Sequence, residues 1–127
     1  MKRFLQYHLP VILYGSLILT VSSIPNLRTP EIRFLAFDKV AHFIEYALFA
    51  FLAFRSLSNL PPRKNGWGAY IATLVCVLIF SFLDELVQYY TPGRHWDILD
   101  ILTDFLSGLL VLVAIRLWYR DIRPSSN

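Results

Sequence analysis

The chain has 127 residues, of which 56% are hydrophobic and 17% are charged. A soluble globular domain is nearer about 45–50% apolar and about 25% charged. The composition therefore favours a small integral membrane protein and argues against an ordinary soluble domain. The net charge of +3 does not indicate nucleic-acid binding, because the basic residues gather at the ends of apolar runs. The single cysteine, Cys76, excludes an intrachain disulfide framework.

Four apolar segments are long enough to cross a membrane. Each is close to the ~20 residues that span ~30 Å of hydrocarbon. Because the hydrocarbon contains no water, the backbone N–H and C=O groups must hydrogen-bond to one another, so each segment is expected to be a helix. Short connections make neighbouring helices antiparallel. We therefore expect one all-α domain over residues 1–127, an integral membrane bundle of four transmembrane helices. The helices are expected at about 4–24, 40–57, 69–89 and 98–119.

The first segment has a second interpretation as a cleavable signal peptide. Basic residues precede its apolar run, and the small residues Ser22 and Ser23 follow. The run is long for a signal peptide, however, and it contains Pro10 and His8, while Pro25 lies just beyond the cleavage point. We therefore expect an uncleaved first helix.

The lysines and arginines predict the orientation. Eight would lie on one side: Lys2, Arg3, Arg55, Arg63, Lys64, Arg116, Arg120 and Arg123. Four would lie on the other: Arg28, Arg33, Lys39 and Arg94. The side with more positive charge is normally cytoplasmic, so both termini are expected inside. On this view Arg55, Arg116 and Arg120 are snorkelling anchors.

Polar residues recur at helical spacing on three segments, close to the predicted outer face. By segment they are Asp38, His42, Glu45 and Tyr46; Ser81, Asp84, Glu85 and Gln88; and Asp97, Asp100, Asp104 and Gly108. This spacing places each set on one helix face. With a rise of about 1.5 Å per residue, the carboxylates reach a similar depth on all three helices. Gly108 should allow close helix approach below its stripe. Ionisable groups at such depth predict a functional polar cleft that opens outward.

The charges of this cleft do not balance. Its seven acids are Asp38, Glu45, Asp84, Glu85, Asp97, Asp100 and Asp104. Only Lys39 and Arg94 carry fixed positive charge, with His42 as a third candidate. Either some acids hold protons or a cation joins them.

Carboxylate oxygens suit a divalent cation such as Mg²⁺ or Ca²⁺, and His42 would also admit zinc. The candidate ligands are Glu45, Asp84, Asp97, Asp100 and Asp104. Arg94 could instead hold a phosphate or carboxylate through its planar fork.

The sequence around the polar residues resembles the VanZ-like family of small bacterial membrane proteins. The resemblance rests on DKVAHFIEY from Asp38, on DELVQ from Asp84, and on PGRHWDILD from Pro92, and it ends at Gly108. The first helix contributes little to it. One departure is Asp104, where the family often has Asn, so the charge of the site differs from the family pattern.

The resemblance implies a multi-pass protein of the bacterial cytoplasmic membrane. The family takes its name from an accessory protein linked to teicoplanin resistance, and the motif alone does not transfer resistance to this chain. The family also offers no accepted catalytic residues.

Three function classes therefore stay open. The first is an enzyme or binding protein acting on an envelope lipid or lipid-linked precursor. In that case Glu45 or Glu85 would be the general base, Asp97 a further catalytic candidate, and Arg94 or a bound cation the headgroup ligand. The second is a proton- or cation-coupled carrier, which would need an oligomer to form a pathway. The third is a structural protein whose polar cluster locks the helices together, although interhelical hydrogen bonds average only ~0.6 kcal/mol.

Overall fold

The computed structural model describes residues 1–26, 35–60 and 67–122, with side chains omitted at 35–37 and 120–122. The only regular secondary structure among these residues is helical. A π-helical turn, η1 (Phe4–His8), leads into α1 (Leu9–Ser22), and α2 (Leu35–Leu57), α3 (Gly68–Tyr90) and α4 (Ile98–Ile122) follow. The all-α prediction is confirmed.

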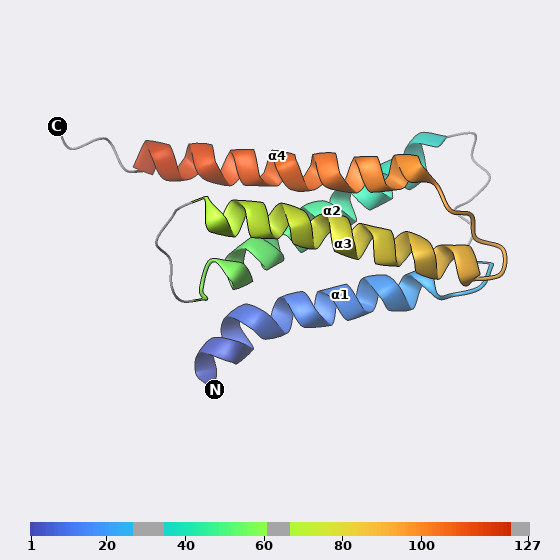
Figure 1. The fold of residues 1–127 in the computed structure, drawn as a ribbon, viewed down its shortest axis with the longest axis horizontal. Helices are drawn as coiled ribbons and strands as arrows, with labels where there is room; N and C mark the ends of the chain where they lie inside the picture. The colour runs from blue at the N-terminus through green and yellow to red at the C-terminus, as the bar shows by residue number, and fades with distance from the viewer. Residues whose placement is uncertain (27–34, 61–66, 123–127) are drawn as a thin grey trace.

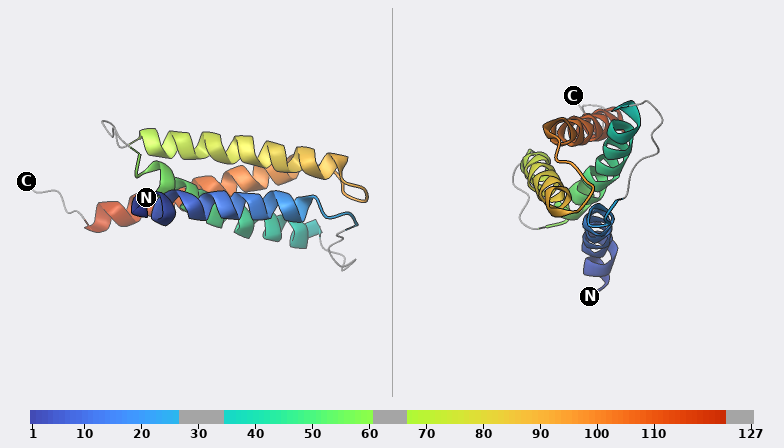
Figure 2. Two further views of the ribbon diagram at one scale, coloured as in Figure 1. Left: turned by 90° about the horizontal axis from the view of Figure 1, so that it is seen from below. Right: turned by 90° about the vertical axis from the view of Figure 1, so that its right-hand side faces the viewer.

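The helices run alternately up and down, so η1 and the end of α4 lie at the same end of the bundle (Figure 1). Seen along the bundle, α2, α3 and α4 surround a common centre, and α1 lies to one side (Figure 2). Within the described residues α1 packs on α2 and α3 but not on α4. The order of the helices therefore gathers the end of α1, the start of α2, the end of α3 and the start of α4 at one end.

The expected helix boundaries agree closely with the structure except at the start of α2. This helix begins at Leu35 rather than near residue 40. The prediction followed the apolar run, but a helix can continue past the hydrocarbon through polar residues, and Asp38 suits the first turns of a helix. Helix α4 likewise continues to Ile122, beyond the expected end at 119.

The first predicted segment contains a local irregularity next to Pro10. The Leu9 N–H bonds to the carbonyl of Phe4, five residues back. Proline lacks an N–H, and its ring clashes with the carbonyl four residues earlier, so a wider turn before Pro10 relieves the clash. From Leu9 the chain continues as regular α-helix to Ser22.

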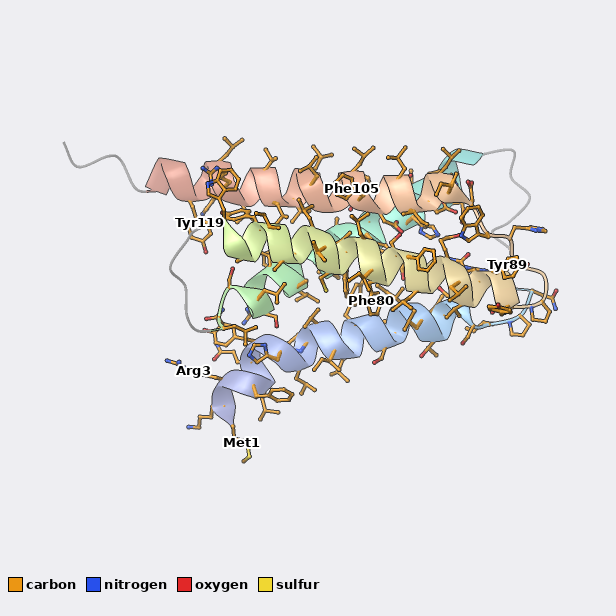
Figure 3. The ribbon with its side chains drawn as sticks, in the orientation of Figure 1. Met1, Arg3, Phe80, Tyr89, Phe105 and Tyr119 are labelled. Carbon is orange, nitrogen blue, oxygen red and sulfur yellow. The ribbon has the colours of Figure 1, made fainter. Side chains whose placement is uncertain are left out.

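The apolar core lies midway along the bundle. Its buried residues are Ile18, Tyr46, Phe49, Ala50 and Val77. Phe80 lies between α3 and α1 and stacks on Phe49, with ring centroids 4.6 Å apart (Figure 3). A Cβ on Gly108 would lie 3.3 Å from the Val77 methyls, so the predicted close approach at Gly108 is confirmed.

The surface has the reverse polarity of a soluble protein. Large side chains such as Ile44, Ile79 and Leu110 are more than half exposed. Four segments are long and apolar enough to cross a membrane: Phe4–Ser22, Asp38–Leu57, Gly68–Tyr90 and Ile98–Tyr119. The chain is a multi-pass membrane protein.

The orientation in the membrane stays a prediction. Five of the basic residues on which it depends lie outside the described residues: Arg28, Arg33, Arg63, Lys64 and Arg123.

Candidate functional site

Helices α1 and α3 finish, and α2 and α4 begin, at one end of the bundle (Figure 1). The acidic residues of these helices gather at that end. Four carboxylic acids are almost fully enclosed there: Asp84, Glu85, Asp100 and Asp104 have at most 2% of their surface exposed. Buried charges are costly unless they are paired and hydrogen-bonded. The partners of each acid therefore decide what the cluster can do.

Lys39 of α2 bridges two acids near the start of α4. Its ammonium lies 2.5 Å from Asp97 Oδ2 and also donates to Asp100 Oδ1. The Asp97 side chain is 37% exposed, whereas that of Asp100 is 3% exposed. Lys39 therefore supplies the positive charge that the buried Asp100 requires.

His42 lies one helical turn deeper than Lys39 and faces Asp104 of α4. The distance from His42 Nδ1 to Asp104 Oδ1 is 3.2 Å. The other oxygen of Asp104 accepts a hydrogen bond from Ser81 of α3 at 2.5 Å. Asp104 thus joins α2, α3 and α4 below the surface of the bundle. An Asn here would keep one acceptor but lose the charge facing His42.

Asp84 of α3 is held by residues from two other helices. Ser22, at the end of α1, donates to Asp84 Oδ1, and the Tyr46 hydroxyl lies 3.4 Å from Asp84 Oδ2. Ser22 is buried and belongs to the site, although the sequence pattern indicated it only as part of a possible signal-peptide cleavage point. A lone serine at the end of an apolar run carries no periodic signal. Its hydrogen bond to Asp84 depends on how α1 packs against α3, which the spacing of residues in the sequence does not give.

Glu85 and Gln88, one turn apart on α3, are buried but only partly satisfied. Glu85 Oε2 accepts the backbone N–H of Asp97 at 2.8 Å. Glu85 Oε1 and Gln88 Nε2 have no hydrogen-bond partner among the described residues. Residues three apart on a helix are neighbours on one face. The same face of α3 therefore carries an unused acceptor and an unused donor near the α3–α4 connection.

Asp97 has a structural task at the start of α4. Its Oδ1 accepts the backbone N–H of Leu99 at 2.9 Å, the contact of a helix N-cap. The hydrogen bond from Lys39, and after it the bond from the Leu99 N–H, holds the pKa of the Asp97 carboxyl below its usual range. A carboxylate engaged in this way is a poor proton acceptor at neutral pH, so the catalytic role predicted for Asp97 is the least favoured of the three.

The connection between α3 and α4 is fixed by the chain that leaves α1. Asn26 donates its backbone N–H to Pro92 O at 3.0 Å. Gly93 has a φ of +80°, and a Cβ there would lie 2.3 Å from Asn26 Oδ1, so this position requires glycine. The neighbouring Arg94 is half-buried, and its backbone N–H bonds to Thr91 O at 3.1 Å. The turn thereby places Arg94 at the edge of the acidic cluster.

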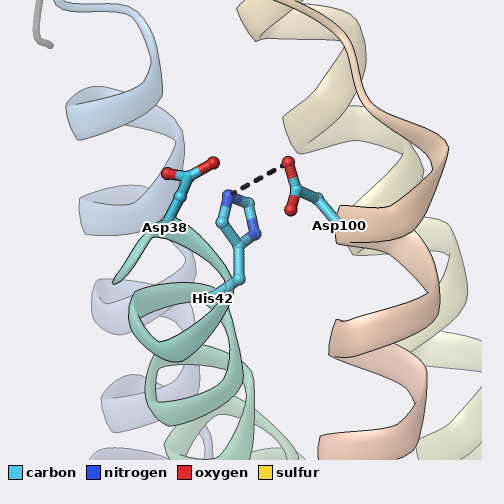
Figure 4. Close-up of side chains that lie close together, drawn as sticks. All are labelled: Asp38, His42 and Asp100. Carbon is cyan, nitrogen blue, oxygen red and sulfur yellow. Dashed lines mark ion pairs between the residues drawn. The ribbon is translucent and has the colours of Figure 1, made fainter. Parts of the chain in front are cut away.

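Asp38 and His42 form a further group with Asp100 (Figure 4). One potential ligand atom from each lies within 4.8 Å of the others, and His42 Nε2 is 4.0 Å from Asp100 Oδ2. A carboxylate–imidazole–carboxylate set suits Zn²⁺ or a hard divalent ion. Of the carboxylate ligands that the sequence predicted, only Asp100 belongs to this group, together with His42, which was expected to admit zinc; Glu45, Asp84, Asp97 and Asp104 lie outside it.

Glu45 lies deeper on α2 and is half-buried. Its strongest electrostatic interactions are with Asp84, His42, Asp104 and Arg94, so it belongs to the same cluster. Helix α1 contacts this position through the backbone: the Tyr14 hydroxyl donates to Glu45 O at 3.3 Å. The buried acids of the predicted cleft thus lie at one end of the bundle, and α1 adds Ser22 to them.

No curated protein and no solved structure matches the chain. The model of the VanZ/LLP1 family, in contrast, matches residues 4–119. This range includes α1 and most of α4 as well as the motifs between Asp38 and Gly108, so the family pattern extends further than those motifs suggested. The chain therefore belongs to the VanZ/LLP1 family, as a multi-pass membrane protein with four membrane-spanning helices.

Proposed function

We propose that this protein binds the polar headgroup of an envelope lipid or lipid-linked precursor at the acidic end of its bundle, in the bacterial cytoplasmic membrane. The observation that supports this most directly is the pair of unpartnered buried atoms, Glu85 Oε1 and Gln88 Nε2. Leaving such groups unsatisfied costs about 1–3 kcal/mol each, and more when the group is charged. A ligand that carries both a donor and an acceptor, such as a sugar hydroxyl or an amide, would satisfy both.

The surroundings of this pair fit an amphipathic ligand that arrives from the lipid. The outer faces of α3 and α4 are apolar, with Leu86 and Leu102 exposed near the site. Arg94 lies in the turn above the cluster, where its planar fork suits a phosphate. A lipid tail would therefore lie against the helices while its headgroup entered the polar end.

If the bound ligand is also transformed, Glu85 is the strongest candidate for a general base. Its Oε2 is held by the Asp97 N–H, which leaves Oε1 for a substrate proton. Glu45 is the second candidate, at greater depth. Asp97 would then act by positioning Glu85 and Lys39 rather than by transferring a proton.

The test is to identify the lipids that co-purify with the protein in mild detergent by native mass spectrometry. Glu85→Gln and Gln88→Leu should each reduce the retained lipid about tenfold or more, since a hydrogen bond to a charged group contributes roughly 1.5–3 kcal/mol. Phe51→Leu is the matched control, because Phe51 is 46% exposed on α2. Phe49 is unsuitable as a control because it is 2% exposed and belongs to the core.

Two results would contradict the proposal. One is a wild-type protein that retains only the lipids of the bulk membrane in their bulk proportions. The other is retention of the specific lipid by Glu85→Gln and Gln88→Leu at the wild-type level. The second result would assign the polar cluster to helix locking.

A cation- or proton-coupled carrier is the second candidate, and the grouping of Asp38, His42 and Asp100 favours it. A divalent ion there would neutralise part of the excess acidic charge. It would have to share Asp100 with Lys39, whose ammonium already donates to that carboxylate. Transport of labelled cations into vesicles by the wild type, and its loss in Asp38→Asn, would support this function over the first.

A further inference from the structure

A large cavity lies at the end of the bundle opposite the acidic cluster. Its volume is about 1100 Å³, and it lies between η1, the end of α2, the start of α3 and the end of α4. Aromatic rings form much of its wall: Tyr7, Phe54, Tyr70, Trp118 and Tyr119. Tyr119 marks this end in Figure 3, and Tyr89 marks the other. Ligand pockets usually measure about 300–1,000 Å³, so this space could hold a substantial part of an amphipathic molecule.

Two arginines from different helices line the cavity. Arg55 of α2 lies over the Tyr7 ring at 5.3 Å, and Arg116 of α4 lies over the Trp67 ring at 3.9 Å. Neither forms an ion pair with the side chains that the structure describes. A guanidinium that stacks on a ring keeps its in-plane N–H donors for a bidentate acceptor. Simple snorkelling does not require two arginines to converge on one cavity from separate helices.

A third polar group of the cavity is also unsatisfied. Ser58 lines the wall, and its hydroxyl oxygen is buried with no hydrogen-bond partner among the described residues. Such a group is costly unless something bonds to it. The wall of the cavity therefore includes an unsatisfied hydroxyl as well as two guanidinium groups, a set that suits a phosphate.

The charge of the whole bundle favours an anion at this end. All the acids of the membrane spans lie at the other end, from Asp38 and Glu45 on α2 to Asp104 on α4. This end is also the one predicted to be cytoplasmic. Basic pockets between transmembrane helices on that side commonly receive anionic headgroups. We propose that this cavity binds the headgroup of an anionic phospholipid between Arg55 and Arg116, with an acyl chain along the aromatic wall.

The experiment is a titration of the purified full-length protein with phosphatidylglycerol, followed by native mass spectrometry. A basic residue near an anionic lipid contributes about fivefold in affinity, so Arg55→Gln combined with Arg116→Gln should weaken binding about 30-fold. Phosphatidylethanolamine, whose ammonium offsets its phosphate charge, should bind the wild type more weakly and should lose less affinity in this double variant. Arg3→Gln is the control for general basic charge, since it removes one positive charge at the same end from a residue outside the cavity wall.

Three other results of the titration would contradict the proposed site. Equal losses in Arg3→Gln and in the double variant would show a general basic surface and overturn the site. Equal wild-type affinity for the two lipids would do the same, and displacement of phosphatidylglycerol by millimolar inorganic phosphate would point to a soluble ligand. If the double variant fails to fold, Arg55→Lys with Arg116→Lys takes its place; it keeps the charge but loses the planar fork, and should bind more weakly than the wild type.

Discussion

Replacing Lys39 by methionine tests whether the acids of the cluster depend on one buried cation. Methionine keeps an apolar stem of similar length but removes the ammonium that contacts Asp97 and Asp100. His42 cannot substitute for it directly, because its Nε2 is 4.0 Å from Asp100 Oδ2. The variant therefore leaves Asp100 buried without its closest positive charge.

The two acids should contribute unequally to the loss of unfolding free energy, because one is more exposed than the other. An ion pair as exposed as Lys39–Asp97, where Asp97 is 37% exposed, is worth about 0.2–1 kcal/mol. Removing one partner of a pair as buried as Lys39–Asp100, where Asp100 is 3% exposed, costs about 3–5 kcal/mol. We expect Lys39→Met to lower the free energy of unfolding by about 4 kcal/mol, mostly through Asp100.

The assay is equilibrium unfolding in mixed detergent micelles at neutral pH. Adding Asp100→Asn to Lys39→Met should recover most of the loss, because the neutral amide no longer needs a cation. Adding Asp97→Asn should recover less than about 1 kcal/mol, and it is a matched control since Asn also serves as an N-cap. Equal recovery by the two second-site changes, or a Lys39→Met protein as stable as the wild type, would refute the reasoning.

Four further predictions follow from the fold and the site. A reporter active only outside the cytoplasm should stay inactive when fused after residue 127; activity would overturn the inside orientation of the C-terminus, which rests on the eight-to-four distribution of basic residues. The pKa of Asp97 is lower in the folded protein, so its contact with Lys39 adds stability above the unfolded pKa near about 4 and loses it as the pH falls through the folded value; the stability difference between wild type and Asp97→Asn should shrink as the pH falls below the unfolded pKa. Chelation with EDTA should lower the melting temperature in detergent, and His42→Gln should weaken that response; identical melting curves with and without EDTA would show that the acids carry protons instead. Gly93→Ala should destabilise the protein by about 1–3 kcal/mol in thermal unfolding, because of its φ of +80° and the adjacent Asn26, and a silent change would contradict that turn.

The helices and their order could be predicted from the sequence because hydropathy depends on composition along the chain. The start of α2 could not, since the signal ends where the apolar run ends, while the helix continues outward to Leu35. The π-helical turn before Pro10 could not be predicted from the pattern of apolar residues either. Local backbone geometry responds to hydrogen bonding around a single proline, which hydropathy does not record.

For the site, helical spacing predicted which residues share a face, and depth predicted which end they share. The hydrogen-bond partners of each side chain could not be predicted from this spacing. They depend on the rotation of each helix about its axis and on side-chain direction. The spacing therefore placed Asp97 and Asp104 in one stripe, but the structure separates their tasks. Asp97 caps α4 near the surface, and Asp104 joins His42 to Ser81 at depth.

The first helix illustrates the same limit most clearly. Its sequence is largely apolar, so it contributed little to the resemblance to the family. In the structure its final residue, Ser22, donates to the buried Asp84, and the chain that follows docks Asn26 on the turn that carries Arg94. The match of the family over residues 4–119 includes this helix. A helix that supplies one buried hydrogen bond and fixes one turn completes the site while adding nothing periodic to the sequence.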